Sequence, residues 1–241
     1  MHDINIPKQI IEACIKKRGR LHVFDKIEVK KTSLIVIDMQ NSWIVSGLSA
    51  LEIPNTRSII PNINKIAKSL RNAGGIVSWT QSTFDCSWTR EMYSKFSDEM
   101  WIQKIMQDTK PGSYGFQINE AMDLQPTDIV STKYRPSAFI QGSSDIDMKL
   151  MDKGCDTLII CGTLTNACCE SSARDAAALG YKVLFLSDGT ATRSDIEHNA
   201  SLINLMQLVA DVRTTEEVIN LIEKNDFYER SEKSSSITPS F

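Results

Sequence analysis

Histidine is scarce in this sequence of 241 residues, which contains only His2, His22 and His198. The three lie far apart in the chain, and none belongs to a His-rich metal-binding pattern. A Ser–His–Asp or Cys–His enzyme would have to use one of them, and none has a supporting neighbourhood. If the chain is a nucleophilic enzyme, we therefore expect a general base other than histidine.

Other features that define special classes of protein are also missing. The six cysteines form no CxxC pair and the chain is too long for a disulfide scaffold, so we expect a reducing, cytoplasmic location. The net charge of −3 gives no reason to expect nucleic acid or an anionic membrane as a partner. No apolar run approaches the length of a membrane span, and the first residues lack the apolar core of a signal peptide.

The sequence does contain a regular alternation of strand and helix patterns. Continuous apolar or β-branched runs predict strands over 33–40, 76–81, 128–132, 158–161, 183–187 and 211–213. Helical spacing predicts helices over 7–17, 59–72, 144–153, 167–179, 194–209 and 214–223. The alternation predicts an α/β protein, a three-layer Rossmann-like fold with a mainly parallel central sheet flanked by helices.

Composition divides the chain into three parts. Residues 1–30 are predicted to form an N-terminal helical lead-in, and residues 31–223 a single domain without internal repeats. Residues 224–241 are rich in charge, Ser and Pro, which predicts a disordered tail. Residues 82–115 show little periodicity, as is typical of a surface excursion over a site.

Cys168 lies in the most informative stretch of the chain. The strand 158–161 leads into a small polar turn, 162–166, and helical spacing begins at Ala167. A thiol there is near the positive end of a helix dipole and unpaired N–H groups, which stabilise a thiolate and can bind an oxyanion. On position alone, this interpretation is only slightly favoured over a small buried residue, so the site needs partners elsewhere.

Two charged residues hold matching positions. Asp38 ends the buried run of the first strand, and Lys133 directly follows strand 128–132. Because carboxyl ends of parallel strands meet at one edge, we expect Asp38, Lys133 and Cys168 to lie together. Asp38 would take the thiol proton and later deliver it to the leaving group, while Lys133 would keep Asp38 charged and help to stabilise the thiolate. Taken singly, a capping or loop Asp explains Asp38 equally well, and a solvated loop lysine is the default interpretation of Lys133.

These motifs resemble those of the isochorismatase-like cysteine hydrolase superfamily. The matching pieces are residues 34–40, Lys133, and 162–171 with 174–176, and the resemblance runs from about residue 30 to about residue 222. It implies a Rossmann-like α/β fold and an Asp–Lys–Cys triad. It also implies an oxyanion hole formed by the N–H groups of Leu164 and Cys168, a cis peptide at Thr163–Leu164, and a homo-oligomer, dimer or tetramer.

Within the superfamily, the sequence looks most similar to the ureidoacrylate amidohydrolases. The shared pieces are Asp-Met-Gln-Asn at 38–41, Trp-x-Gln at 79–81 and Lys-x-Arg-x-Ser-x-Phe at 133–139. Nicotinamidases carry an Asp/His metal cluster after the second strand, whereas residues 81–85 here contain no histidine, so we expect no metal and no cofactor. The resemblance implies a metal-independent amidohydrolase that cleaves a C–N bond of a small ureido, carbamoyl or amide substrate through a thioester on Cys168.

The substrate pocket is expected to be built largely by residues 41–58, 82–118 and 134–143. Arg135 is a candidate clamp for a substrate carboxylate, although stabilisation of its own loop explains it equally well. Two other functions stay open: vinyl-ether hydrolysis with Asp38 as the acid and Cys168 idle, and a non-catalytic binding module. The predicted substrate-binding residues are Asn41, Trp43, Trp79, Gln81, Tyr134, Arg135, Phe139 and Thr163.

Overall fold

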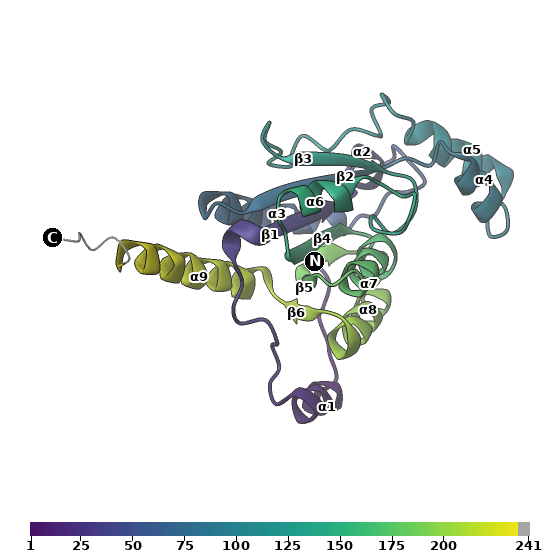
Figure 1. The fold of residues 1–241 in the computed structure, drawn as a ribbon. Helices are drawn as coiled ribbons and strands as arrows, with labels where there is room; N and C mark the ends of the chain where they lie inside the picture. Colours follow the sequence, from purple (N-terminus) through teal and green to yellow (C-terminus); the bar gives the residue numbers. More distant parts are fainter. Residues whose placement is uncertain (236–241) are drawn as a thin grey trace.

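The computed structural model of the protein describes residues 1–235, and within them six parallel strands form one sheet in the order β3-β2-β1-β4-β5-β6 (Figure 1). This arrangement confirms the predicted α/β class and Rossmann-like architecture. The strands are β1 (Thr32–Ile37), β2 (Ile76–Ser82), β3 (Ile129–Lys133), β4 (Thr157–Thr163), β5 (Lys182–Ala191) and β6 (Asp211–Arg213).

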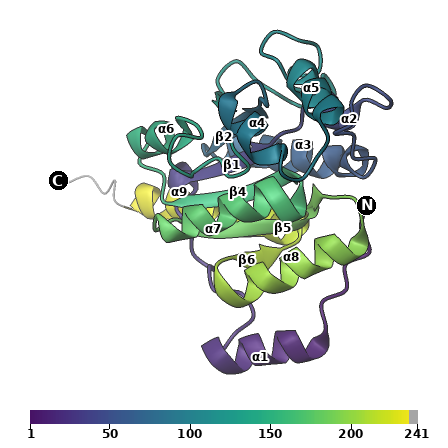
Figure 2. The ribbon, with the colours of Figure 1, turned by 90° about the vertical axis from the view of Figure 1, so that its right-hand side faces the viewer.

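Helices cover both faces of the sheet, with α3 and α9 on one face and α6, α7 and α8 on the other (Figures 1 and 2). The lead-in helix α1 packs outside α8, where Arg18 donates a hydrogen bond to the Met206 carbonyl at 2.9 Å. No helix within residues 1–235 is both long and apolar enough to cross a bilayer. The α-helices are α1 (Lys8–Arg18), α2 (Asn41–Ile44), α3 (Thr56–Asn72), α4 (Ser87–Tyr93), α5 (Glu99–Asp108), α6 (Ile146–Asp152), α7 (Glu170–Ala178), α8 (Asp195–Leu208) and α9 (Thr215–Ser235); a 3-10 turn spans Val29–Lys31 and a π-helical turn, η2, spans Thr165–Cys169.

Strand β1 lies at the centre of the core, and its sequence shows why. Leu34 and Val36 pack in the apolar cluster that α3 and α9 cover, whereas Ile35 and Ile37 pack in the opposite cluster with α7 and α8. All four side chains are fully buried, which accounts for a continuous apolar run rather than an alternating one. Burial of each such side chain stabilises the fold by roughly 1.5–3 kcal/mol.

The strand order reverses between β1 and β4, the position at which open α/β sheets bind ligands. Gly162 allows the two strands to approach closely at this point. Its φ is +110°, and a Cβ on it would lie 2.1 Å from the Ile37 carbonyl oxygen. Only glycine therefore lets the end of β4 lie beside the end of β1, where the residues after each strand can meet.

Two segments that were predicted to lack regular secondary structure contain helices. Residues 82–115 contain α4 and α5; α5 is capped by Asp98, whose carboxylate accepts the Trp101 N–H at 2.8 Å. Helix α9 continues through residues 224–235, which were expected to begin a disordered tail, while residues 236–241 of that tail lie outside the described residues. Charged residues such as Glu and Lys extend a helix readily once packing has nucleated it, so a polar composition did not exclude helix here.

Strand β5 is longer than predicted, ending at Ala191 instead of Ser187. The Asp188-Gly189 pair resembles a turn, but pairing with β4 shifts register there and resumes at Gly162↔Thr190 and Thr163↔Ala191. The carboxyl end of β5 therefore lies level with that of β4, and the residues that follow it reach the same edge of the sheet.

Candidate active site

Asp38 lies directly after β1 and is fully buried, with a φ of +54° that brings it into the left-handed region. Asp tolerates this region better than most residues. Two hydroxyl groups of β2 donate hydrogen bonds to its carboxylate: Thr80 Oγ1 to Oδ1 at 3.0 Å, and Ser82 Oγ to Oδ2 at 2.9 Å. Both oxygens of this buried carboxylate are thus fixed in place.

Lys133 ends β3, and its side chain is buried with 1% exposure. Its Nζ lies 2.9 Å from Asp38 Oδ2, 2.6 Å from Ser82 Oγ, 3.1 Å from the Arg135 carbonyl oxygen and 3.5 Å from Cys168 Sγ. Burial alone would lower the pKa of this ammonium, but the negative charges of Asp38 and an ionised Cys168 raise its pKa above the usual range. Lys133 is therefore charged and paired with Asp38.

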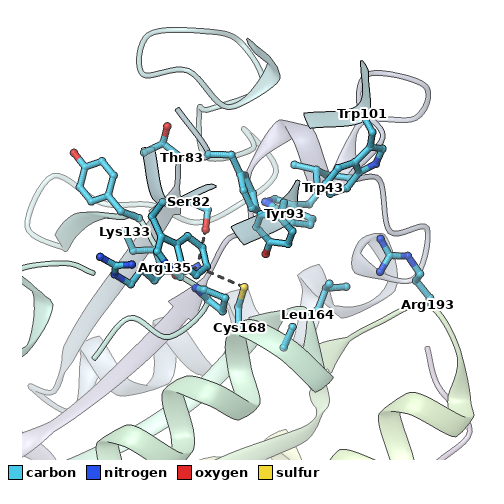
Figure 3. Close-up of a pocket in the computed structure, with 16 residues that line it drawn as sticks. Trp43, Ser82, Thr83, Tyr93, Trp101, Lys133, Arg135, Leu164, Cys168 and Arg193 are labelled. Atoms are coloured by element: carbon cyan, nitrogen blue, oxygen red, sulfur yellow. Dashed lines mark hydrogen bonds between the residues drawn. The ribbon is translucent and has the colours of Figure 1, made fainter. Parts of the chain in front are cut away.

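Cys168 lies in η2, just before α7, with its sulfur between Lys133 and the cavity (Figure 3). The Asp38 carboxylate lies close enough to the thiol to affect its pKa. Burial, partly opposed by Lys133 and reinforced by Asp38, raises the pKa of Cys168 to about 11. The resting site therefore holds a neutral thiol beside a carboxylate. The sequence had suggested a stabilised thiolate, but desolvation of the sulfur outweighs the attraction of Lys133.

The turn between β4 and Cys168 contains the expected cis peptide, at Thr163–Leu164. The Leu164 carbonyl accepts hydrogen bonds from the N–H groups of Ala167 at 3.2 Å and Cys169 at 3.0 Å, which close the turn. Leu164 and Cys168 both line the cavity. Their role as an oxyanion hole stays a prediction.

A cavity of about 140 Å³ opens in front of Cys168, beneath α4 and α5 (Figure 3). Six of its sixteen lining residues are aromatic, which suits a small substrate with a flat or apolar body. Its lining residues are Trp43, Leu51, Ser82, Thr83, Phe84, Trp88, Tyr93, Trp101, Lys133, Tyr134, Arg135, Pro136, Leu164, Ala167, Cys168 and Arg193.

Two arginines give this cavity an unbalanced positive charge. Arg135 is half-buried, with its guanidinium carbon 5.2 Å from the centre of the Trp88 ring, and Arg193 lies on the other side, beyond Leu164 (Figure 3). Neither guanidinium has an ion pair or a hydrogen bond with another described residue, and none of the described lining residues is Asp or Glu. Because Asp38 neutralises Lys133, the surplus charge comes from the arginines.

Tyr93 of α4 directs its hydroxyl into the cavity (Figure 3). Burial raises the pKa of this phenol to about 12, so it is a neutral donor at physiological pH. Within the described part of the chain, the hydroxyl has no hydrogen-bond partner, although the ring packs against Phe84 and Trp101. This leaves one oriented donor available for a bound molecule.

The structure places three of the predicted substrate-binding residues, Trp43, Tyr134 and Arg135, in the cavity wall. The other five do not line the cavity. Asn41 and Gln81 donate hydrogen bonds to the carbonyls of Tyr114 and Phe116, at 2.9 Å each, and so hold the loop around residues 114–119.

Trp79, Phe139 and Thr163 point elsewhere because they pack within the fold. Trp79 is buried in the core and donates its Nε1–H to Asp128 at 2.8 Å, and the Phe139 ring packs near that of Tyr181. The Thr163 hydroxyl donates to the Ala191 carbonyl at 3.2 Å. Proximity to a strand end was a poor guide here, since alternate residues of a strand point to opposite faces.

Sequence reasoning did not identify Arg193 or Leu51 individually. Arg193 lies two residues after the end of β5. Asp38 was found because it lies at the end of a predicted strand, and the same reasoning would have found Arg193 if β5 had been predicted to end at Ala191. Leu51 lies within the range 41–58 expected to contribute to the pocket, but its isolated apolar character gave no specific signal. Within residues 1–235, no group of three or more His, Cys, Asp or Glu side chains is arranged to hold a metal ion.

The fold and this site together define an α/β protein of the cysteine hydrolase type, with carboxylate, ammonium and thiol at the sheet's switch point. The isochorismatase domain matches residues 32–217, and the isochorismatase family protein YwoC of Bacillus subtilis is 30% identical over 203 residues, covering 82% of this chain and 97% of that protein. The chain belongs to the isochorismatase family.

Solved structures agree with this placement. A cysteine hydrolase from Pseudomonas syringae pv. phaseolicola matches with a TM-score of 0.75 and 28% identity, covering 86% of this chain and 98% of that one. An isochorismatase-like hydrolase from Alkaliphilus metalliredigens matches with a TM-score of 0.64 and 27% identity, covering 78% and 97%. The family is thus established from sequence and structure, while the substrate has to be inferred from the cavity.

Proposed function

We propose that this protein is a cysteine amidohydrolase that cleaves a C–N bond of a small anionic amide, carbamoyl or ureido compound. The observation that carries the proposal is the buried contact of Asp38, Lys133 and Cys168 at the mouth of an aromatic cavity. A neutral thiol beside a fixed carboxylate suits general-base activation of the nucleophile at the moment of attack.

In the proposed reaction, Asp38 takes the Cys168 proton as the sulfur attacks the carbonyl carbon. The N–H groups of Leu164 and Cys168 bind the resulting oxyanion. When the C–N bond breaks, the protonated Asp38 gives its proton to the leaving nitrogen, and a thioester on Cys168 remains. Water then attacks the thioester while Asp38 accepts a water proton, which returns to the thiolate. Lys133 stays charged throughout and holds Asp38 in position.

The cavity supports an anionic substrate. A compound bearing a carboxylate would pair with Arg135 or Arg193, which have no acidic partner, while its flat body would contact the aromatic wall. Ureido acids and carbamoyl amino acids combine a cleavable C–N bond with a carboxylate, and ureidoacrylate-like compounds also have a flat body. This class is therefore the first to be tested.

The test is ammonia release from a panel of ureido acids, carbamoyl amino acids and primary amides, in which each anionic compound is paired with its neutral ester. We expect turnover of anionic members, and a Cys168→Ala variant should lose about a thousandfold or more of kcat. Cys86→Ser is the matched control, because Cys86 is half-exposed and does not line the cavity. Full turnover by Cys168→Ala would eliminate the covalent mechanism.

Charge selection is tested separately with Arg135→Gln and Arg193→Gln. Substitution of the arginine that pairs with the carboxylate should raise KM for anionic substrates about tenfold while changing KM for the neutral esters little, since a charge-assisted hydrogen bond contributes about 1.5–3 kcal/mol. Equal KM values for acid and ester in the parent enzyme would show that the cavity does not select an anion, whatever the mechanism of cleavage.

A further inference from the structure

His2 lies far from Cys168 in the sequence but is built into the structure that supports it. Its side chain is 1% exposed, and its ring stacks on that of His198 with centres 4.3 Å apart and planes at 16°. The segment around it is fastened along α8, where Asn199 accepts the Asn5 N–H at 2.7 Å and donates to the Asp3 carbonyl at 2.8 Å. His2 is thus an ordered part of the molecule's interior.

The hydrogen bonds of His2 fix its protonation and orientation. Its Nε2 accepts the backbone N–H of Thr192 at 3.0 Å, so Nδ1 must carry the proton, which it donates to Asp195 Oδ1 at 2.7 Å. The Thr192 hydroxyl in turn donates to Asn166 Oδ1 at 2.6 Å. One route from His2 therefore ends on the second residue of η2, the turn that carries Cys168.

A second route passes through the stacked imidazole. His198 Nε2 lies 2.9 Å from the Ser187 carbonyl oxygen, which can only accept, so Nε2 carries the proton. His198 Nδ1 is then an acceptor and receives the Thr165 hydroxyl at 2.9 Å. Thr165 is the first residue of η2. Both routes meet in the same turn and hold its first two residues by their side chains.

We propose that His2 is a positioning residue of the active site, which holds the η2 turn through His198 and Thr192 so that the Cys168 sulfur stays in contact with Lys133. This inference rests on the proposed role of Cys168 as the nucleophile. Asn166 and Thr165 anchor the turn against β5 and α8, and His2 fastens both anchors at once. Loss of this support lets the turn move and weakens the 3.5 Å contact that favours the thiolate.

The test measures alkylation of Cys168 by iodoacetamide, which needs no substrate. A background with both half-exposed thiols replaced, Cys86→Ser and Cys155→Ser, leaves only buried cysteines among the described residues, and peptide mapping identifies the modified one. His2→Ala should slow Cys168 alkylation about threefold or more, as is typical of a substitution along a coupled network. His2→Gln, which can accept from Thr192 and donate to Asp195, should recover most of the rate.

The matched control is His22→Ala. His22 Nδ1 lies 2.7 Å from Asp211 Oδ1, so this change removes a comparable His–Asp contact of the lead-in segment, but at β6 and away from Cys168. It should leave Cys168 alkylation unchanged. His2→Phe keeps an aromatic ring without its hydrogen bonds, and should fold and behave as His2→Ala does; its urea unfolding midpoint confirms that the native state is measured.

An unchanged or faster alkylation rate in His2→Ala and His2→Phe would overturn the proposal, as would an equal effect of His22→Ala. Failure of the proposed function is distinguishable from this outcome. If Cys168→Ala retained full turnover, the covalent mechanism would be wrong. The alkylation rates would still show whether the reactivity of Cys168 depends on His2.

Discussion

Removal of the Lys133 ammonium tests whether the centre of this site is a true buried ion pair. In Lys133→Met, the Asp38 carboxylate keeps the Thr80 and Ser82 hydroxyls but loses its ion pair with the Lys133 ammonium at 2.9 Å. Because Asp38 has 0% exposure, water cannot replace that partner. Breaking a buried pair in this way costs about 3–5 kcal/mol of folding free energy.

The size of this cost should depend on pH. An unpaired, buried carboxyl has a raised folded-state pKa, so in the variant the native state binds a proton that the unfolded chain has released. Stability then falls as pH rises above the unfolded pKa of about 4, by up to about 1.4 kcal/mol per pH unit. In the parent protein the pKa of Lys133 is raised, and the stabilisation that this gives is fully present below the unfolded pKa of about 10.4. It is lost only at higher pH. The Lys133–Asp38 pair therefore gives the parent no loss of stability with pH near neutrality.

Urea unfolding followed by tryptophan fluorescence at about pH 5 and about pH 7.5 measures both effects. Lys182→Met is the matched control: its ammonium lies 3.1 Å from Asp156, but the two side chains are 40% and 42% exposed. That surface pair should be worth about 0–1 kcal/mol at either pH. If Lys133→Met lost as little unfolding free energy as Lys182→Met, and the same amount at both pH values, Lys133 and Asp38 would not form a buried ion pair.

Three further measurements follow from other features of the structure. Gly162→Ala should lower the free energy of urea unfolding by at least about 2 kcal/mol, because its Cβ would overlap the Ile37 carbonyl oxygen. Gly154→Ala, which has open space at φ +69°, should lower it by only about 1 kcal/mol. Equal losses would contradict the close approach of β1 and β4. Tyr93→Phe should lower kcat/KM about three- to tenfold without lowering the unfolding midpoint, because its hydroxyl has no partner among the described residues; unchanged kinetics would exclude a contact with substrate. Burial lowers the pKa of His198 to about 4, so between about pH 4 and about pH 6.5 this imidazole is protonated only in the unfolded chain. Stability should therefore rise with pH across this range, by up to about 3 kcal/mol in total. If the pH–stability profile of His198→Gln had the same slope, this histidine would not be its source.

The pattern of apolar residues along the chain predicted the parallel sheet, and the sheet predicted that Asp38, Lys133 and Cys168 lie close together. The reason is physical: β1 is buried on both faces, so its apolar run is continuous, and a parallel sheet gathers the ends of its strands. Asp38 follows β1, Lys133 ends β3 and Cys168 lies in the turn after β4, so the parallel topology brings all three to one edge of the sheet.

The cavity wall could not be predicted in the same way. Half of its six aromatic residues come from α4 and α5, which are short helices without a long periodic pattern. Helix α5 depends on the cap at Asp98 and on burial of Ile102 and Ile105. The position of Arg193 depends on a register shift in β5, which a local sequence signal for a turn concealed. The protonation state of Cys168 depends on burial, which only the packed structure reveals.

The high pKa of Cys168 also bears on chemical damage. Peroxide attacks thiolates, and oxidation of a cysteine to sulfenic and then sulfinic acid follows its anionic fraction. Because its pKa is raised, the Cys168 thiol of the idle protein offers oxidants less thiolate than an ordinary exposed cysteine does. In the proposed mechanism the sulfur becomes anionic only when Asp38 takes its proton, so we expect oxidative damage to Cys168 to accompany turnover.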